Sequence, residues 1–173
     1  MDKSYLVLSA LGPDRPGLVA AIAEEIKGRG GNVEESRMAV LGAEFGVMML
    51  VGGSADVLSA VERELPKLAE RLGLGVLTRR TKAQTRAAGL PCTLVASAFD
   101  QEGIVHSLAD ALGKLGVNIV SLETSTYHAS MSGAPLFRFE AALDVPRGVG
   151  LASLRAHLVE VSKSLDLDVD LRT

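Results

Sequence analysis

The sequence predicts an α+β protein made of two tandem ferredoxin-like domains, each with the element order βαββαβ. Three observations lead to this prediction. One segment is repeated at a constant offset, strand-period and helix-period apolar patterns alternate in the same order in both halves, and the composition is aliphatic. Of the 173 residues, 47% are hydrophobic and 3% are aromatic, so the chain is long enough for two small domains with aliphatic cores.

The repeat joins the segment LGPDRPGLVAAIAEEIKGRGGNV, which starts at Leu11, to the segment SAFDQEGIVHSLADALGKLGVNI, which starts at Ser97. Aligned without a gap, the segments pair Asp14 with Asp100, Gly17 with Gly103, Val19 with Val105, Gly30 with Gly116 and Asn32 with Asn118. Each pair has the same separation of 86 positions. We therefore expect two copies of one fold, over residues 1–82 and 92–173, joined by a linker at 83–91.

In the first copy, Leu18, Ile22 and Ile26 recur at helical spacing and predict the first helix. The other expected elements are a strand at 4–10, a glycine stop at 28–31, a hairpin at 32–41 and 44–51, a helix that Ser54 caps and Pro66 kinks or restarts, and a strand at 75–81. The second copy repeats this order, with strands expected at 92–99, 118–128, 135–145 and 167–172 and helices at 104–115 and 151–165.

The start of the first helix carries unusual backbone control. We expect Pro16 in the first helical turn, where the missing N–H has no intrahelical partner to lose. Asp14 is expected to accept one of the free amides at the positive end of the helix dipole. Gly17 has no Cβ, so a second molecule can approach its backbone closely. Together these residues predict a partly positive concavity.

Charge and composition exclude several classes of protein. The net charge of −3, with acids and bases interspersed, argues against broad binding to nucleic acid or anionic membrane. No apolar run approaches the roughly 18 residues of a membrane span, and the N-terminus has no cleavage signal. The one cysteine, Cys92, suits a reducing compartment. We therefore expect a cytoplasmic protein.

The motifs of enzymes and of nucleic-acid binders are missing from the sequence. The three histidines are scattered, and no metalloprotease, nucleophile-elbow or phosphate-loop motif occurs. His106 and Asp110 share a helix face, but two ligands do not make a metal site. No helix is strongly basic, and stacking aromatics are few. We expect no enzymatic activity, no cofactor, no metal and no direct DNA binding.

The segment ALGPDRPGLV, followed by GGNVEESRMAVLGAEFGVMML, resembles the amino-terminal ACT domain of the glycine cleavage system transcriptional repressor family. The likeness is strong over residues 1–82 and extends to the whole chain as architecture. It implies an amino-acid-sensing regulatory protein, with glycine or serine as the first ligands to test, that acts as a transcriptional co-repressor through a partner transcription factor. ACT domains bind such ligands at the loop between the first strand and the first helix, often between two domains.

Carried over residue by residue, the resemblance implies a ligand site at Asp14, Arg15, Pro16, Gly17, Leu18, Val19, Gly31, Asn32 and Val33. Amides from Gly17 to Val19 would bind the ligand carboxylate, as a helix N-terminus does. Asn32, which we expect beside that loop, offers both a donor and an acceptor.

A second, weaker site is implied at Asp100, Gln101, Gly103, Ile104, Asn118 and Ile119. Here Gln101 and Glu102 stand where the first copy has Arg15 and Pro16. Glu102 places an acid where a carboxylate would dock, which weakens the site or shifts its preference toward a cationic group.

Two alternatives stay open at this point. The paired aspartates and asparagines of the repeat are also explained as local caps of helices and turns. A ligand-free ACT-type module that serves only interaction and dimerisation fits the same repeat. In either case, exposed edges or faces of ferredoxin-like sheets favour packing of the copies and a homodimer.

Overall fold

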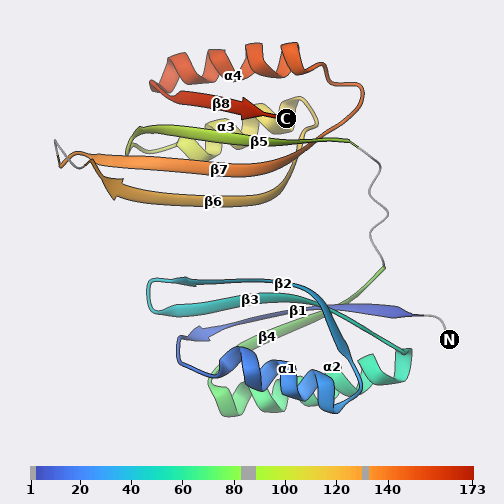
Figure 1. Cartoon of the computed structure of the whole chain (residues 1–173). Helices are drawn as coiled ribbons and strands as arrows, with labels where there is room; N and C mark the ends of the chain where they lie inside the picture. The colour runs from blue at the N-terminus through green and yellow to red at the C-terminus, as the bar shows by residue number, and fades with distance from the viewer. Residues whose placement is uncertain (1–2, 83–88, 130–132) are drawn as a thin grey trace. The chain divides into compact units, whose positions relative to one another are not determined.

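The computed structural model describes residues 3–82, 89–129 and 133–173. The chain divides into two compact units, residues 1–85 and 86–173, which we describe separately (Figure 1). Residues 83–88 of the expected linker and 130–132 of the hairpin loop in the second copy lie outside the described residues. Within each unit the elements follow the order βαββαβ, so the predicted fold class is confirmed.

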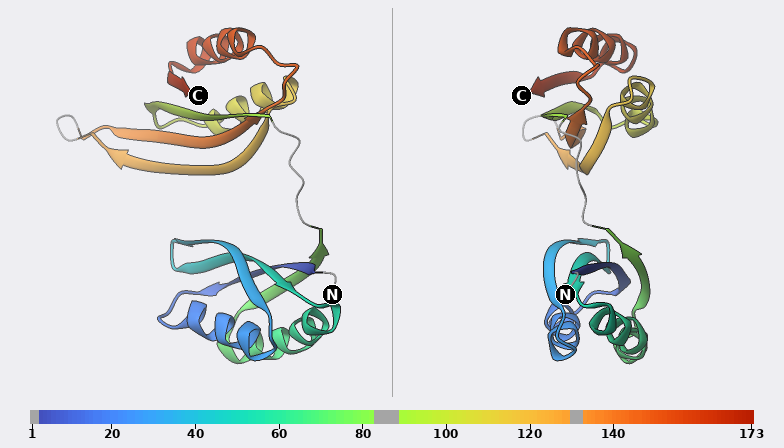
Figure 2. Two further views of the ribbon diagram at one scale, coloured as in Figure 1. Left: turned by 45° about the vertical axis from the view of Figure 1, so that its right-hand side comes forward. Right: turned by 90° about the vertical axis from the view of Figure 1, so that its right-hand side faces the viewer.

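The first unit contains β1 (Ser4–Pro13), α1 (Leu18–Gly28), β2 (Asn32–Leu41), β3 (Glu44–Gly53), α2 (Ala55–Leu72) and β4 (Gly75–Thr81). Its strands form one antiparallel sheet in the order β2-β3-β1-β4. Both helices lie on the same face of this sheet (Figures 1 and 2). The opposite face carries no helix of the unit.

The second unit contains β5 (Leu90–Phe99), α3 (Ile104–Lys114), β6 (Asn118–His128), β7 (Pro135–Val145), α4 (Leu151–Leu165) and β8 (Asp168–Arg172). Its sheet has the matching order β6-β7-β5-β8, again antiparallel. The strands and helices of both units fall close to the ranges that the apolar periods predict. The second unit therefore has the same topology as the first.

One face of each sheet and one stripe of each helix make the two cores. In the first unit the inward residues of β1 are Leu6, Leu8 and Ala10, and they meet Leu18, Ile22 and Ile26 of α1 and Leu58, Val61 and Leu65 of α2. The second core is built the same way around Leu94, Leu108, Leu112, Phe139, Leu154 and Leu158. Each such leucine contributes about 1.5–3 kcal/mol by its removal from water.

The repeat in the sequence corresponds to a repeat in backbone conformation. Gly17 and Gly103 both precede a first helix with positive φ, at 93° and 89°. Asn32 and Asn118 each begin the second strand of their sheet. In both strands a β-bulge follows directly, between Val33 and Glu35 and between Ile119 and Ser121. The aligned residues therefore occupy the same elements.

Two local expectations about proline are wrong. Pro16 lies in the turn before α1, because the helix begins at Leu18. For Pro66 the restart is wrong, since α2 runs unbroken through it, whereas a kink at this position stays a prediction. Burial of the neighbouring Leu65 and Leu68 against the sheet holds this helix together despite the missing N–H.

The helix caps give the first prediction. Ser54 accepts a hydrogen bond from the Val57 N–H at 3.3 Å, whereas α4 begins after Gly150, which provides no side-chain cap. Ser54→Ala is expected to lower the free energy of unfolding of the first unit by about 1 kcal/mol. Gly150→Ser is expected to stabilise the second unit by a few tenths of a kcal/mol, because its backbone already has the extended conformation of a cap.

Site-resolved hydrogen exchange separates the two units, so it measures both changes in the full chain. Ser54→Thr, which keeps the capping hydroxyl, is the control, and equal effects of Ser54→Ala and Ser54→Thr would show that the cap is not the cause.

Candidate functional site

The loop between β1 and α1 brings together most of the first predicted site. Asp14 to Gly17 form this loop, and α1 begins directly after Gly17. No side chain caps α1, so the expectation that Asp14 accepts a free amide is wrong. The same correction applies to Asp100 at α3, which begins after Gly103. A glycine in the left-handed conformation makes the turn into each helix, and both aspartates are exposed.

The N-terminus of α1 therefore presents free amides. The first intrahelical bond runs from the Ala21 N–H to the Gly17 oxygen at 3.0 Å, so the amides of Leu18, Val19 and Ala20 precede it. No acidic residue occupies the first turn, and nothing lies within 4 Å of the position where Gly17 would carry a Cβ. The positive end of the helix dipole is thus open to an anion.

Two bonds fasten this loop to the rest of the unit. The Asp14 N–H donates to the Ala43 oxygen at 2.9 Å, which ties the loop to the turn between β2 and β3. The Arg15 guanidinium donates to the Leu72 oxygen at 2.8 Å, at the last residue of α2. Arg15 thus caps the C-terminal end of α2 and is not turned toward the free amides.

The second unit uses the same two bonds with a different side chain. The Asp100 N–H donates to the Pro135 oxygen at 3.1 Å. The Gln101 amide donates to the Leu165 oxygen, the last carbonyl of α4, at 2.6 Å. Arg15 and Gln101 therefore play the same role, since each anchors its loop to the last carbonyl of the second helix of its unit. The sequence alone does not show this equivalence, because the two residue types differ.

Asn32 does not lie beside the loop, which corrects the expected geometry. In the sheet, Asn32 pairs with Gly52 and Ser4 pairs with Gly53, whereas Pro13 pairs with Glu44 at the other end. Asn32 is thus at the end of the sheet where β1 begins, and the loop is where β1 ends. Helix α1 spans the distance between them, because it returns antiparallel to β1 (Figure 1). A single domain cannot bring both to one small ligand.

Around Asn32 the structure assembles a polar cluster that sequence reasoning missed. The Asn32 side-chain amide donates to Glu34 Oε1 at 3.0 Å, and Lys3 Nζ lies 3.0 Å from the same oxygen. The β-bulge after Val33 leaves Glu34 unpaired in the ladder. Its carboxylate lies over Gly52, where a Cβ would be only 2.6 Å away. No sequence pattern predicts a bulge of this kind. The only local signal is Gly52, a glycine within a strand, which allows this close approach of the carboxylate.

The hydrogen bond from Asn32 lowers the pKa of Glu34, with a further contribution from Lys3. Glu34 in turn raises the pKa of Lys3, mainly through their hydrogen bond. The cluster is therefore charged at neutral pH, with one carboxylate between an amide and an ammonium group. Such a carboxylate can also accept from an ammonium group of a ligand.

Other residues of the first predicted site are packed in the hydrophobic core or against it. Leu18 is 2% exposed, so its side chain is not available to a ligand. Val33 packs against the first core, and a Cβ at Gly31 would meet Ile26 Cγ2 at 2.9 Å. Gly31 is therefore needed for close packing of the turn against α1.

The second unit lacks several of these features. Ile104 is 2% exposed, so its side chain is not accessible, and Ile119 is partly buried against the core. Val120 follows Ile119 at the bulge, where the first unit has Glu34. Asn118 pairs with Asp144, where Asn32 pairs with Gly52, so the acid at this end stands on the neighbouring strand and not at the bulge. With Glu102 just before the start of α3 as well, the second unit differs from the first at both ends.

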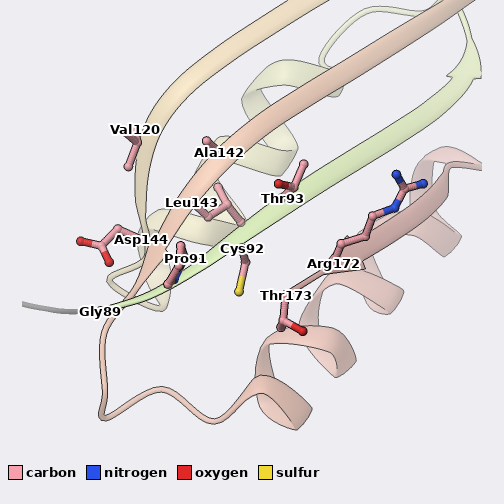
Figure 3. Close-up of a pocket in the computed structure, with 10 residues that line it drawn as sticks. All are labelled: Gly89, Pro91, Cys92, Thr93, Val120, Ala142, Leu143, Asp144, Arg172 and Thr173. Atoms are coloured by element: carbon pink, nitrogen blue, oxygen red, sulfur yellow. The ribbon is translucent and has the colours of Figure 1, made fainter.

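A hollow of about 540 Å³ lies at the Asn118 end of the second sheet (Figure 3). Its lining includes Asp144, Arg172, Thr93 and Cys92. Burial raises the pKa of the Cys92 thiol, so the thiol is protonated at neutral pH and is a poor nucleophile. Within the part of the chain that the structure describes, no three metal-binding side chains cluster. None of the helices described is long and apolar enough to cross a membrane.

The hydrogen bond from Arg15 to the Leu72 oxygen gives a prediction. Arg15→Ala is expected to speed hydrogen exchange of the loop amides of Asp14, residue 15 and Gly17 several-fold, because the bond to Leu72 is worth about 0.5–1.5 kcal/mol. Arg15→Gln is expected to keep the wild-type rate, since glutamine makes the corresponding bond in the second unit. Arg29→Ala, which removes an exposed arginine on the same unit, is the control. An Arg15→Gln rate equal to that of Arg15→Ala would contradict the assignment.

The cluster at Asn32 gives a second prediction. Asn32→Ala is expected to raise the pKa of Glu34 toward its ordinary value of 4.5, measured by NMR of the side-chain carboxyl group. Because this pKa is lowered in the folded chain, the stabilisation is present above the ordinary value and is lost as the pH falls through the folded value. Asn118→Ala is the control and leaves Glu34 unchanged. A pKa of Glu34 that is the same in Asn32→Ala as in the wild type would contradict the hydrogen bond between Asn32 and Glu34.

Comparison with known proteins places this architecture in a family. The ACT domain family matches residues 4–78. Over 155 residues the chain is 30% identical to the glycine cleavage system transcriptional repressor of Escherichia coli strain K12, covering 88% of this chain and 81% of that protein.

Solved structures agree with this comparison. The crystal structure of an unknown protein from Galdieria sulphuraria is 32% identical, with a TM-score of 0.82 and coverage of 99% of this chain and 98% of that one. A second crystal structure, of a protein put forward as a glycine cleavage system transcriptional repressor, shares the fold at 24% identity with a TM-score of 0.75, covering 98% and 96% of the two chains. The chain therefore belongs to the glycine cleavage system transcriptional repressor family of tandem ACT-domain proteins.

Proposed function

We propose that this protein is a non-enzymatic regulator that binds a small α-amino acid through its first ACT domain and passes the bound state to a protein partner. The relative from Escherichia coli is named as a repressor of the glycine cleavage system, which supports a role as a transcriptional co-repressor. Glycine and serine are the ligands to test first. The partner in this proposal is a transcription factor, because the chain has neither a basic helix nor stacking aromatics for reading DNA itself.

One observation carries the proposal: the N-terminus of α1 is open, uncapped and free of acidic side chains. A ligand carboxylate would accept hydrogen bonds from the amides of Leu18, Val19 and Ala20. A small ligand fits the proposal best because its backbone must come close to Gly17, where no side chain stands in the way. Asp14, Arg15 and Pro16 would shape the loop and would not donate to the ligand directly.

The ammonium group of the ligand needs an acceptor. Glu34 supplies a carboxylate and Asn32 an amide oxygen, and both lie at the opposite end of the domain from the loop. In this proposal a second copy of the domain contributes Asn32 and Glu34 to the loop of the first. Binding would then link two domains, which gives the ligand a means of changing what the protein presents to its partner.

The second unit is proposed to bind such a ligand weakly or not at all. Glu102 stands near the amides of α3, and like charge disfavours a carboxylate there. Val120 stands at the position of Glu34, and the carboxylate at this end of the second sheet belongs instead to Asp144, the cross-strand partner of Asn118. The second unit would serve mainly to contact the partner or to associate with another copy.

A matched pair of substitutions tests the proposal. Val19 and Val105 are equivalent, and their side chains are 39% and 38% exposed. Val19→Glu adds a carboxylate in the first turn of α1. Its charge interacts favourably with the helix dipole and so does not destabilise the helix, but it repels a bound carboxylate. Val105→Glu does the same in the second unit and is the control.

In a thermal-shift series with the twenty amino acids, saturating ligand is expected to stabilise the wild type by about 2.7 kcal/mol at a hundredfold excess over its Kd. Val19→Glu is expected to abolish the shift and Val105→Glu to keep it. Asn32→Ala and Glu34→Gln are expected to weaken ligand binding, raising the Kd about tenfold or more. If no amino acid shifts the wild type, the protein is a ligand-free interaction module.

A further inference from the structure

One face of the first sheet is covered by neither helix of its own unit, since α1 and α2 both lie on the other face (Figure 2). This open face forms a shallow hollow of about 1000 Å³ whose floor includes Val7, Met48, Leu50 and Leu77. Met48 and Leu77 are 56% and 71% exposed, which is high for large apolar side chains in a strand. An apolar surface of this kind marks an interaction site in soluble proteins.

The register of the strands arranges the open face in lateral rows. One row runs from Glu35 on β2 through Leu50 on β3 and Val7 on β1 to Arg79 on β4. The row therefore carries an acid at one edge of the sheet, a base at the other edge and two apolar side chains between them. All four residues line the same hollow, which confirms that they share the open face.

This row is self-complementary. When two such faces stack with a two-fold axis parallel to the strands, the β2 edge of one sheet lies over the β4 edge of the other. We propose that the open face of the first domain binds the same face of a second copy of this chain. Glu35 then meets Arg79 of the second copy, Arg79 meets Glu35 of that copy, and the apolar centres of the rows cover each other.

The neighbouring features fit the same arrangement. The next row, Arg37, Met48, Ser9 and Leu77, places the stem of Arg37 over the apolar Leu77 of the second copy. Among the described residues, Arg79 has no ion pair or side-chain hydrogen bond, so its charge is available. Glu35 has only the exposed Arg37 as a partner, at 3.0 Å.

The second domain provides an internal comparison. The row equivalent to that of Glu35 and Arg79 consists of Ser121, Ala142, Thr93 and Arg172, which keeps the base and lacks the acid. The next row consists of Glu123, Glu140, Val95 and Asp170. Where the first face has the apolar Met48 and Leu77, the second has Glu140 and Asp170. Glu140 and Asp170 are paired within the domain with Arg138 and Arg172, at 2.8 and 2.6 Å. The second face therefore has neither the apolar centre nor the opposite charges at its edges that the first face has, and the proposal concerns the first face alone.

Face-to-face stacking is separate from the domain pairing in the proposed amino-acid site. A two-fold axis parallel to the strands brings like ends of the two sheets together, so the loop of one domain does not meet Asn32 of the other. Each proposal can therefore fail without the other, and the experiment below uses no ligand.

Charge reversal in the full-length protein tests the interface by sedimentation velocity and light scattering. The wild type is expected to dimerise at tens of micromolar, in the range of about 1–100 µM. In Arg79→Glu, the new acid of each copy faces Glu35 of the other copy. In Glu35→Arg, the new base of each copy faces Arg79 of the other copy, so each substitution acts at both ends of the paired row. Each single reversal is expected to raise the dimer dissociation constant about a hundredfold. The double variant, Glu35→Arg with Arg79→Glu, is expected to restore dimerisation.

Two further variants complete the design. Leu77→Asp is expected to abolish the dimer, and Arg172→Glu, at the equivalent position of the second sheet, is expected to leave it unchanged. All these side chains are exposed, so circular dichroism and NMR dispersion should match the wild type. A wild type that stays monomeric at about 100 µM, a dimer that survives both Arg79→Glu and Leu77→Asp, or a double variant that stays monomeric would each overturn the proposal.

Discussion

One-sided burial of a four-stranded sheet is the constraint on which the rest of each domain depends. Two helices cover one face, because the βαββαβ order returns each helix to the same side. The inward residues of the central strands are fully buried as a result, whereas β2 and β6 are exposed along almost their whole length. Every feature with a proposed role lies on what this arrangement leaves open: a helix start, a strand edge or a sheet face.

The loop between the first strand and the first helix illustrates how packing prepares a site without occupying it. A left-handed glycine turns the chain into the helix, and bonds to a hairpin carbonyl and to a helix C-terminus hold the loop from two sides. Because these bonds satisfy the loop itself, the amides of the helix N-terminus are left without a partner. Residues that look like ligand contacts in the sequence, such as Arg15, are in part the supports of the loop.

The two domains share this framework and differ in charge. Their loops are fastened alike by Arg15 and Gln101, and their bulges fall at equivalent positions. The first domain has a carboxylate at its bulge and an apolar open face with opposite charges at its edges. The second has an acid near its helix start and a row of acids on its open face. These differences are the reason for proposing different binding roles for the two copies of one fold.

The sequence by itself determined the fold, the repeat and the cores, because strand and helix periods are local and the offset of 86 positions aligns every special residue. It also predicted the Ser54 cap, which depends only on neighbouring residues. Only the tertiary structure separated Asn32 from the loop, since strand register is a non-local property. The cluster at Glu34, the bond from Arg15 to Leu72 and the row from Glu35 to Arg79 likewise join residues whose contact depends on sheet pairing and helix packing, which no local pattern encodes.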